Sequence, residues 1–317
     1  MVEDTSPWLA RFPVTLFTTV MGMSGLTLAL AEGETVLDLA HGMSTLSAFV
    51  TVAVFGLVTA CYTVKAARHP KAVHAEWDHP VSLAFFPAIS ISLLLLAAVA
   101  LPWSELVSRG LWLVGAGLQL ILTLAVISSW IGSRSFVHGH LTPAWFVPAV
   151  GNVIAPLAGA QLGYIEISWF FLSIGLLFWI VLLAMVINRL VFHDPLPERL
   201  QPTLVILIAP PAIGFLGWTS LNSGLDPMAR ILMNATFFFL LVVALQLPTI
   251  LRLPFSLSFW ALSFPLAAAT TASLRFSTLS GSGFHLWLGL ALLCLLTLTL
   301  LVLLIKTTTS LARGAAF

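Results

Sequence analysis

The side chains that could carry acid–base chemistry in this sequence are its carboxylates, and their positions limit what that chemistry can be. The twelve acidic residues are Glu3, Asp4, Glu32, Glu34, Asp38, Glu76, Asp78, Glu105, Glu166, Asp194, Glu198 and Asp226. All of them lie between long apolar runs or at the ends of such runs. A proton- or sodium-coupled pump usually places an ionisable carboxylate at membrane depth. Their absence from the runs argues against a proton relay and against a cation pathway lined by carboxylates.

Imidazoles and thiols are equally poorly placed for catalysis or for holding a cofactor. The eight histidines are His41, His69, His74, His79, His138, His140, His193 and His285, and they avoid the interiors of the runs. A membrane haem would need axial histidines inside facing helices, which disfavours a subunit of a redox complex. Cys61 and Cys294 both lie within apolar runs, so we expect neither a disulfide framework nor a metal site. We therefore predict no enzyme, no cofactor and no metal.

The elements that must position any functional group are membrane-spanning helices. Of 317 residues, 59% are hydrophobic and 8% are charged, and the net charge of +1 gives no case for nucleic acid. A spanning helix needs about 20 predominantly apolar residues. Ten runs meet this need: Phe12–Ala31, His41–Val64, Pro80–Leu101, Leu111–Gly132, Thr142–Leu162, Trp169–Val191, Gln201–Leu221, Met228–Pro248, Pro254–Leu274 and Phe284–Ile305. The sequence predicts an all-α integral membrane protein, with residues 1–317 as a single ten-span domain.

Basic residues are shared unevenly between the two sets of connecting loops. One set holds Arg11, Lys65, Arg68, Lys71, Arg134, Arg189, Arg199, Arg252, Lys306 and Arg313. The other set holds only Arg109, Arg230 and Arg275. Because basic residues accumulate in cytoplasmic loops, we expect both termini, residues 1–11 and 307–317, in the cytoplasm. The lipid bilayer is the predicted environment, and a cell (inner) membrane is the predicted location.

An internal repeat is marked by proline. Each odd-numbered run opens at or near a proline, namely Pro13, Pro80, Pro143, Pro202 and Pro254. Four of these runs also have interior prolines: Pro87, Pro148 with Pro156, Pro210 with Pro211, and Pro265; the first has Gly22 and Gly25 instead. Interior prolines bend a helix, and broken helices are tolerated at membrane depth where protein or a cavity covers them. We predict five helical hairpins in a quasi-fivefold ring, with inner helices kinked at Pro87, Pro148, Pro210 and Pro265 around a pore.

The predicted inner helices carry polar side chains without charge. These are Thr15, Thr18, Thr19, Ser82, Ser90, Asn152, Gln161, Thr203, Thr270, Thr271 and Ser273. Hydroxyls that pack between helices would give the same pattern, but together with bent helices they favour a neutral conduit. Our candidates for its lining are Thr18, Ser90, Asn152, Ala268 and Thr271. A neutral conduit favours ions that lose water easily, such as nitrate, and the nearby basic residues favour anions.

One stretch in the ninth run, SFPLAAATT, combines a bulky side chain with a helix break. Phe264 precedes Pro265, and Ala267, Ala268 and Thr271 follow on the same helical face. Small residues leave room beside the phenylalanine ring. From these residues alone, we predict a kinked inner helix of a neutral pore.

Several stretches resemble the bacterial tellurite-resistance protein TehA and the plant slow-type guard-cell anion channels. They are HPVSLAFFPA (79–88), FVPAVGNVIAPLAGAQLG (146–163), LVILIAPPAIGF (204–215) and WALSFPLAAATTASLRFS (260–277). The resemblance implies an anion channel of ten helices in quasi-fivefold hairpin repeats, assembled as a homotrimer with one pore per protomer. It implies that Phe264 blocks the pore as a gate. It also implies a second constriction at Phe85 or Phe86, between which the sequence does not choose.

Two functions therefore stand after the sequence analysis. The first is a passive channel for small inorganic anions such as chloride and nitrate. The second is a transporter that exports an oxyanion or a dicarboxylate, such as tellurite, sulfite or malate, because the resembling family includes members so described. About eleven residues flank the first and last spans, so we do not expect control through long phosphorylated tails.

Overall fold

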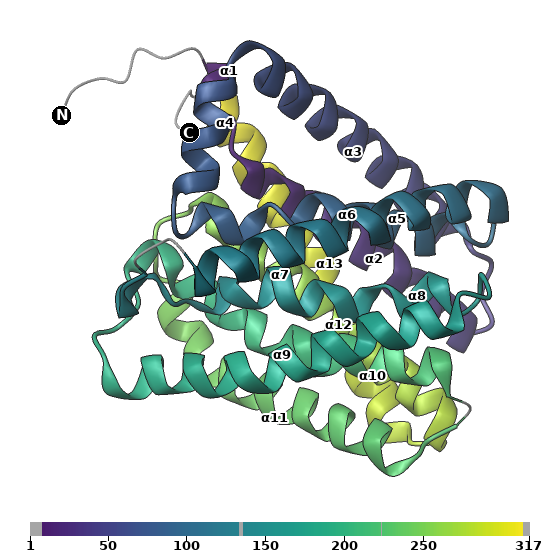
Figure 1. Ribbon diagram of the computed structural model, residues 1–317. Coiled ribbons are helices and arrows are strands. Elements are labelled where there is room, and N and C mark those ends of the chain that lie inside the picture. The colour runs from purple at the N-terminus through teal and green to yellow at the C-terminus, as the bar shows by residue number, and fades with distance from the viewer. Residues whose placement is uncertain (1–7, 133–135, 223, 313–317) are drawn as a thin grey trace.

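The structure is a computed structural model that describes residues 8–132, 136–222 and 224–312. Across these residues the chain forms helices and no β-strand. Arg134, Arg313 and most of the expected cytoplasmic ends, at 1–7 and 313–317, lie outside the described residues. The chain enters through a short helix, α1 (Trp8–Arg11), and the helices that follow cross back and forth in one bundle (Figure 1). The predicted all-helical membrane fold is confirmed.

Five long uninterrupted helices form the outer layer. They are α3 (Gly42–Arg68), α6 (Glu105–Ile131), α9 (Ile165–Phe192), α11 (Pro227–Ile250) and α13 (Gly283–Ala312). Only 28–33% of the residues in their apolar windows are buried. Their remaining apolar side chains face outward, which is favourable in hydrocarbon and not in water. These helices correspond to the even-numbered runs.

The odd-numbered runs form the inner layer, and each begins with a 3₁₀ segment. The pairs are η1 (Val14–Leu16) with α2 (Phe17–Val36), η2 (Ser82–Phe85) with α5 (Ala88–Ala100), η6 (Glu198–Ile208) with α10 (Ala209–Leu221), and η7 (Leu257–Leu262) with α12 (Ser263–Ser280). In these four inner spans, 72–78% of the residues in the apolar windows are buried. The predicted division into inner and outer helices is therefore present in the described residues.

The fifth run differs from the expected continuous span at Thr142–Leu162. It is divided into η4 (Pro143–Trp145), α7 (Phe146–Val150), η5 (Gly151–Ile154) and α8 (Pro156–Gly159). Nine helices in the described part of the chain are long and apolar enough to span a membrane, and this broken segment is the shorter tenth. Proline and glycine recur every few residues along it, and neither sustains an α-helix. Between α6 and η4, the chain also forms η3 (His138–His140).

The interior prolines mark the change from 3₁₀ helix to α-helix in three inner segments. Pro87 is the N-cap of α5, Pro210 lies in the first turn of α10, and Pro265 is the third residue of α12. Proline is tolerated in the first turn because its missing N–H would have no helical partner there. The expected kinks are thus changes of helix type. Pro148 lies instead inside the short helix α7.

The inner segments contact one another in a closed order. Helix α2 contacts α5, α5 contacts η5 and α8, these contact α10, α10 contacts α12, and α12 contacts α2. The last contact, between purple and yellow-green segments in Figure 1, is close because two glycines of α2 face α12. A Cβ built on Gly22 would lie 2.6 Å from Ser263 Cβ, and one built on Gly25 would lie 2.6 Å from Ala267 Cβ.

A buried ion pair ties the first inner segment to its neighbours. Lys65, expected in a loop, lies in the last turn of α3 with 1% of its side chain exposed. Its Nζ pairs with Glu76 Oε2 at 2.9 Å and donates to Phe12 O at 2.7 Å. Glu76, on the short helix α4 (Pro70–Asp78), also accepts from Val14 N at 3.1 Å. One carboxylate therefore joins α3 and α4 to the start of the first inner segment.

Helix α2 runs five residues beyond the expected end of the first span at Ala31. Glu34 is buried in its last turn, and its Oε1 accepts hydrogen bonds from the backbone N–H groups of Met43 (2.8 Å) and Ser44 (3.2 Å). These are among the first N–H groups of α3, which have no partner within their own helix. The carboxylate thereby supports both helices. Glu32 and Glu34 lie in the last two turns of α2, at the end of a helix that is longer than the predicted span.

Candidate functional site

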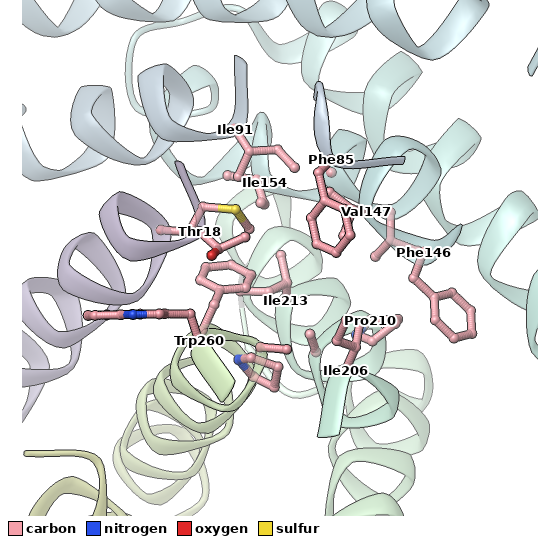
Figure 2. A pocket seen from close by; sticks show the side chains of 17 residues that line it. Thr18, Phe85, Ile91, Phe146, Val147, Ile154, Ile206, Pro210, Ile213 and Trp260 are labelled. Carbon is pink, nitrogen blue, oxygen red and sulfur yellow. The ribbon is translucent and has the colours of Figure 1, made fainter. Parts of the chain in front are cut away.

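An apolar cavity of about 50 Å³ lies among the N-terminal halves of the inner segments. All five inner segments line it, with Thr18 from α2, Phe85 from η2, Phe146 from α7, Pro210 from α10 and Trp260 from η7 among the lining residues. Figure 2 shows Thr18, Phe85 and Ile213 converging on this space from separate elements. The changes from 3₁₀ to α-helix surround it, so the prolines shape the backbone that bounds it.

The two phenylalanines of the third run have different environments. Phe85 lines the apolar cavity. Phe86 is buried and packs edge-on against Trp77 of α4, with ring centroids 4.9 Å apart. The two side chains diverge because η2 ends between them, at Phe85. Phe85 is the one that borders the space.

A second cavity, here called the polar cavity, lies among the C-terminal halves of the same segments and measures about 210 Å³. All five inner segments again contribute, with Gly25 from α2, Leu95 from α5, Leu157 from α8, Ser220 from α10 and Thr271 from α12. Ala268 lines it as well. Two predicted lining residues, Ala268 and Thr271, therefore border this cavity, and Thr18 borders the other.

Phe264 and Ile213 belong to the linings of both cavities. Phe264 is the second residue of α12 and is half-buried. A Cβ built on Gly25 would lie 3.5 Å from Phe264 Cδ2, so the ring lies against α2 where that helix has no side chain. Pro265 lines the apolar cavity beside it. The phenylalanine thus stands where the small apolar space meets the larger polar one.

The hydroxyl groups that line these cavities donate to their own helices. Thr18 Oγ1 donates to Thr15 O at 2.6 Å, and Thr271 Oγ1 donates to Ala267 O at 3.0 Å. In the polar cavity, Thr219 and Ser220 also donate to backbone carbonyls of α10. A hydroxyl has a single hydrogen to donate. These groups consequently present lone pairs, and not hydrogens, to the cavities.

Ser90 and Asn152 line neither cavity and take part in a buried network instead. Ser90 Oγ donates to Gln119 Oε1 at 2.7 Å. Asn152 Nδ2 donates to Ala149 O at 2.7 Å and lies 3.3 Å from Pro148 O. Gln119 and Thr123, on the outer helix α6, also donate to Pro148 O. Polar side chains satisfy the carbonyl that the broken helix leaves free, as they must in hydrocarbon. Pro87 and Pro148 line neither cavity.

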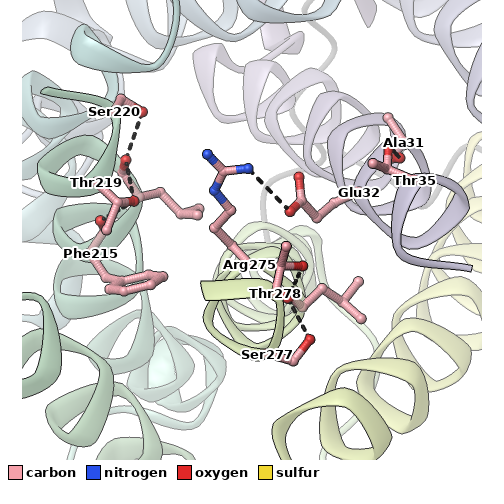
Figure 3. Close-up of polar contacts among 11 residues, drawn as sticks. Ala31, Glu32, Thr35, Phe215, Thr219, Ser220, Arg275, Ser277 and Thr278 are labelled. Atoms are coloured by element: carbon pink, nitrogen blue, oxygen red, sulfur yellow. Dashed lines mark hydrogen bonds and ion pairs between the residues drawn. The ribbon is translucent and has the colours of Figure 1, made fainter. Parts of the chain in front are cut away.

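Arg275 of α12 and Glu32 of α2 face each other across the polar cavity. Arg275 Nη1 lies 3.9 Å from Glu32 Oε1, and both residues line the cavity (Figure 3). Arg109, by contrast, pairs with Glu105 and donates to Tyr164 Oη, and Arg230 lines neither cavity. An acidic residue therefore borders the polar cavity. We expected Glu32 outside the inner helix, because the predicted span ended one residue before it, at Ala31.

Among the described residues, no group of three or more His, Cys, Asp or Glu side chains is arranged to hold a metal ion. The arrangement instead offers a narrow apolar passage, an aromatic ring at its end, and a wider space with one basic and one acidic side chain. Such a path suits the passage of a small solute.

Comparisons with known proteins identify a family of anion channels. The sequence model of the family described as voltage-dependent anion channel, SLAC1, matches residues 11–308. The S-type anion channel SLAH2 of Arabidopsis thaliana is 28% identical over 283 residues, which cover 87% of this chain and 54% of the plant protein. The tellurite resistance protein TehA homolog of Haemophilus influenzae is 27% identical over 267 residues, 83% of this chain and 81% of that protein. An uncharacterized transporter of Methanocaldococcus jannaschii is 24% identical, and the alignment covers 98% of both chains. The chain spans about half the length of the plant relatives SLAH2 and SLAH3.

Proposed function

The chain belongs to the SLAC1 family of voltage-dependent anion channels, and we propose that it is a passive channel for small monovalent anions, chloride and nitrate among them. The observation that carries this proposal is the pair of cavities lined by all five inner segments. They follow one another along the bundle and share Phe264 and Ile213. A path of this kind crosses the bundle without a tight charged site at its narrow part. Ions then pass by partial loss of water, which favours weakly hydrated anions.

Phe264 is the proposed gate of this path, and Phe85 is the proposed second constriction. Both rings border the apolar cavity, where a hydrophobic constriction blocks ions by its size and by excluding water. The closed order of contacts among the inner segments supports a quasi-fivefold arrangement of hairpins. We further propose a homotrimer in the inner membrane with both termini in the cytoplasm. The charge asymmetry of the loops, ten basic residues in one set against three in the other, supports this orientation.

The direct test is Phe264→Ala in planar bilayers or proteoliposomes, with current recorded in chloride and in nitrate. We expect a clear rise in conductance, because the substitution removes the ring between the two cavities. Phe215→Ala is the matched control: Phe215 is fully buried on α10 and lines neither cavity. The control should lose stability, by about 3–5 kcal/mol, without a rise in conductance. Unchanged current in folded Phe264→Ala protein would refute the gate.

A coupled transporter of an oxyanion or a dicarboxylate is the second candidate. One observation favours it: Glu32 places an ionisable carboxylate in the polar cavity, and coupled transporters use such groups. A relative named for tellurite resistance is consistent with oxyanion transport. The two candidates differ in their need for a driving gradient. Anion efflux from liposomes with and without a proton gradient separates them, because a flux that requires the gradient contradicts the channel.

A further inference from the structure

Arg275 stands in the polar cavity beyond the proposed gate, and its side chain is 44% exposed. Glu32 faces it with 21% of its side chain exposed. Figure 3 shows the guanidinium between Glu32 of α2 on one side and Thr219 and Ser220 of α10 on the other. Among the described residues that line the two cavities, Arg275 carries the one positive charge and Glu32 the one negative charge.

The guanidinium of Arg275 offers more hydrogen-bond donors than any other polar group of this cavity. Thr219, Ser220 and Thr271 each donate their hydroxyl hydrogen to a carbonyl of their own helix, and Gln161 Nε2 also donates to a carbonyl. An arginine has five N–H donors in a planar fork and stays charged at any accessible pH. At 3.9 Å the contact with Glu32 is an ion pair longer than a direct hydrogen bond. Among the described residues that line this cavity, Arg275 therefore offers an anion a positive charge together with several N–H donors, whereas Gln161 has one further amide hydrogen and no charge.

The ion pair is not required to hold α2 and α12 together. The backbone of α2 at Gly22 and Gly25 already packs closely against Ser263 and Ala267 of α12, about two to three turns from Glu32 along α2. A partly exposed pair adds little to stability, because water screens it. Its position in the lining, on the other hand, gives each charge access to whatever enters the cavity. The arrangement is better suited to act on a permeating ion than to brace the fold.

We propose that Arg275 binds the permeating anion in the polar cavity and that Glu32 competes with that anion for the guanidinium. The inference rests on the proposed anion conduction and adds to it a binding residue and a built-in competitor. The carboxylate of Glu32 is itself an anion tethered next to Arg275, so an incoming anion must displace it. Conduction requires binding strong enough for entry and weak enough for release. Glu32 weakens the binding and so allows release.

The test compares wild-type protein with Glu32→Gln, Arg275→Gln and the double variant, in proteoliposomes over a range of chloride concentrations. Glu32→Gln should lower the chloride concentration at half-maximal flux by about twofold to fivefold, the range that a partly exposed ion pair corresponds to. Arg275→Gln should raise that concentration, and Arg275→Lys should recover part of the loss. In the Arg275→Gln background, Glu32→Gln should change nothing further, because its effect passes through the guanidinium. Glu166→Gln is the control, since Glu166 is an exposed carboxylate at the start of α9 outside both cavities.

Two results overturn the inference. An unchanged half-maximal concentration in Glu32→Gln shows that no competition occurs. A persistent effect of Glu32→Gln in the Arg275→Gln background shows that Glu32 acts as a bare charge and not through Arg275. Failure of the proposed function is distinct, since it gives no chloride flux in the wild type or in Phe264→Ala. In that case, chloride-dependent stabilisation against heat in detergent reports binding without conduction. Glu32→Gln should enlarge it and Arg275→Gln remove it; equal stabilisation in all variants contradicts the inference.

Discussion

Replacing Glu76 should destabilise the protein more than replacing its partner Lys65. The two residues join α3 and α4 to the start of the first inner segment, but their exposures differ, at 1% for Lys65 and 18% for Glu76. Glu76→Gln leaves an ammonium group buried, with Phe12 O at 2.7 Å as a neutral partner. Breaking a buried ion pair by removing one partner costs about 3–5 kcal/mol. The partial exposure of Glu76 places the expected loss near about 3 kcal/mol.

Substitution of the other partner, Lys65, leaves the carboxylate of Glu76 unpaired, and this charge is easier to accommodate. In Lys65→Met, Glu76 keeps the N–H of Val14 at 3.1 Å and the hydroxyl of Tyr62 at 3.0 Å, and water can reach it. Each hydrogen bond to a charged group contributes about 1.5–3 kcal/mol. We therefore expect a loss of about 1–2 kcal/mol, of the order of one lost hydrogen bond. Methionine fills most of the volume that the lysine stem occupied.

Denaturant unfolding in detergent micelles, followed by tryptophan fluorescence, measures both losses. The double variant Lys65→Met with Glu76→Gln should lose less than the sum of the single variants, because each single variant includes the penalty of an unpaired charge. Glu105→Gln, whose carboxylate is exposed on α6, should be nearly neutral. Equal losses for the two single variants, or strict additivity in the double variant, would show that the difference in burial does not govern this site.

Three further outcomes can be measured. Phe85→Ala should raise anion conductance in the Phe264→Ala background, whereas Phe86→Ala should lower thermal stability and leave conductance unchanged, because only the first ring borders the apolar cavity. Gly25→Val should destabilise the protein by about 1–3 kcal/mol through overpacking against α12. Gly56→Ala should not, because the space around Gly56 is open. Equal thermal midpoints for the two variants would contradict the close approach of α2 to α12. Asp226 is the N-cap of α11, and the hydrogen bond that its carboxylate accepts from the backbone N–H of Ala229 lowers its pKa. Its stabilisation is thus fully present above the ordinary carboxyl pKa and is lost as pH falls through the lowered pKa of the folded state. Asp226→Ala should therefore lower the thermal midpoint at neutral pH and make no difference in strong acid.

The inner and outer layers were predictable because hydrocarbon imposes its own rules on sequence. Prolines are tolerated at depth only where protein covers the broken backbone, and their confinement to odd-numbered runs indicated which helices are buried. Sequence could not show that Pro87, Pro210 and Pro265 sit at a change from 3₁₀ to α-helix. Proline fits both a kinked helix and a first turn, so its position alone does not distinguish them.

The candidate site was predictable in part. The proline and the small residues predicted a kinked inner helix at Phe264, and the family resemblance implied its role as a gate; in the structure Phe264 lines both cavities. Ser90 and Asn152 looked equivalent to Thr18 in sequence, but they turn to the carbonyls freed near Pro87 and Pro148. Their partners Gln119 and Thr123 lie on an outer helix, and a glutamine in a lipid-facing run was the available signal. The choice between Phe85 and Phe86 depends on where η2 ends, which no local pattern marks.

Barrier and binding lie in series along the proposed path. The apolar cavity of about 50 Å³, with Phe85 and Phe264 on its lining, offers an ion no donors and little room for water. The polar cavity of about 210 Å³ holds Arg275 and Glu32. A hydrophobic constriction limits how fast an ion crosses, whereas a charged pair sets how often an ion is present to attempt it. Substitutions at Phe264 should consequently alter maximal conductance, and substitutions at Glu32 should alter the concentration at half-maximal flux. One group performing both roles would make these two quantities change together.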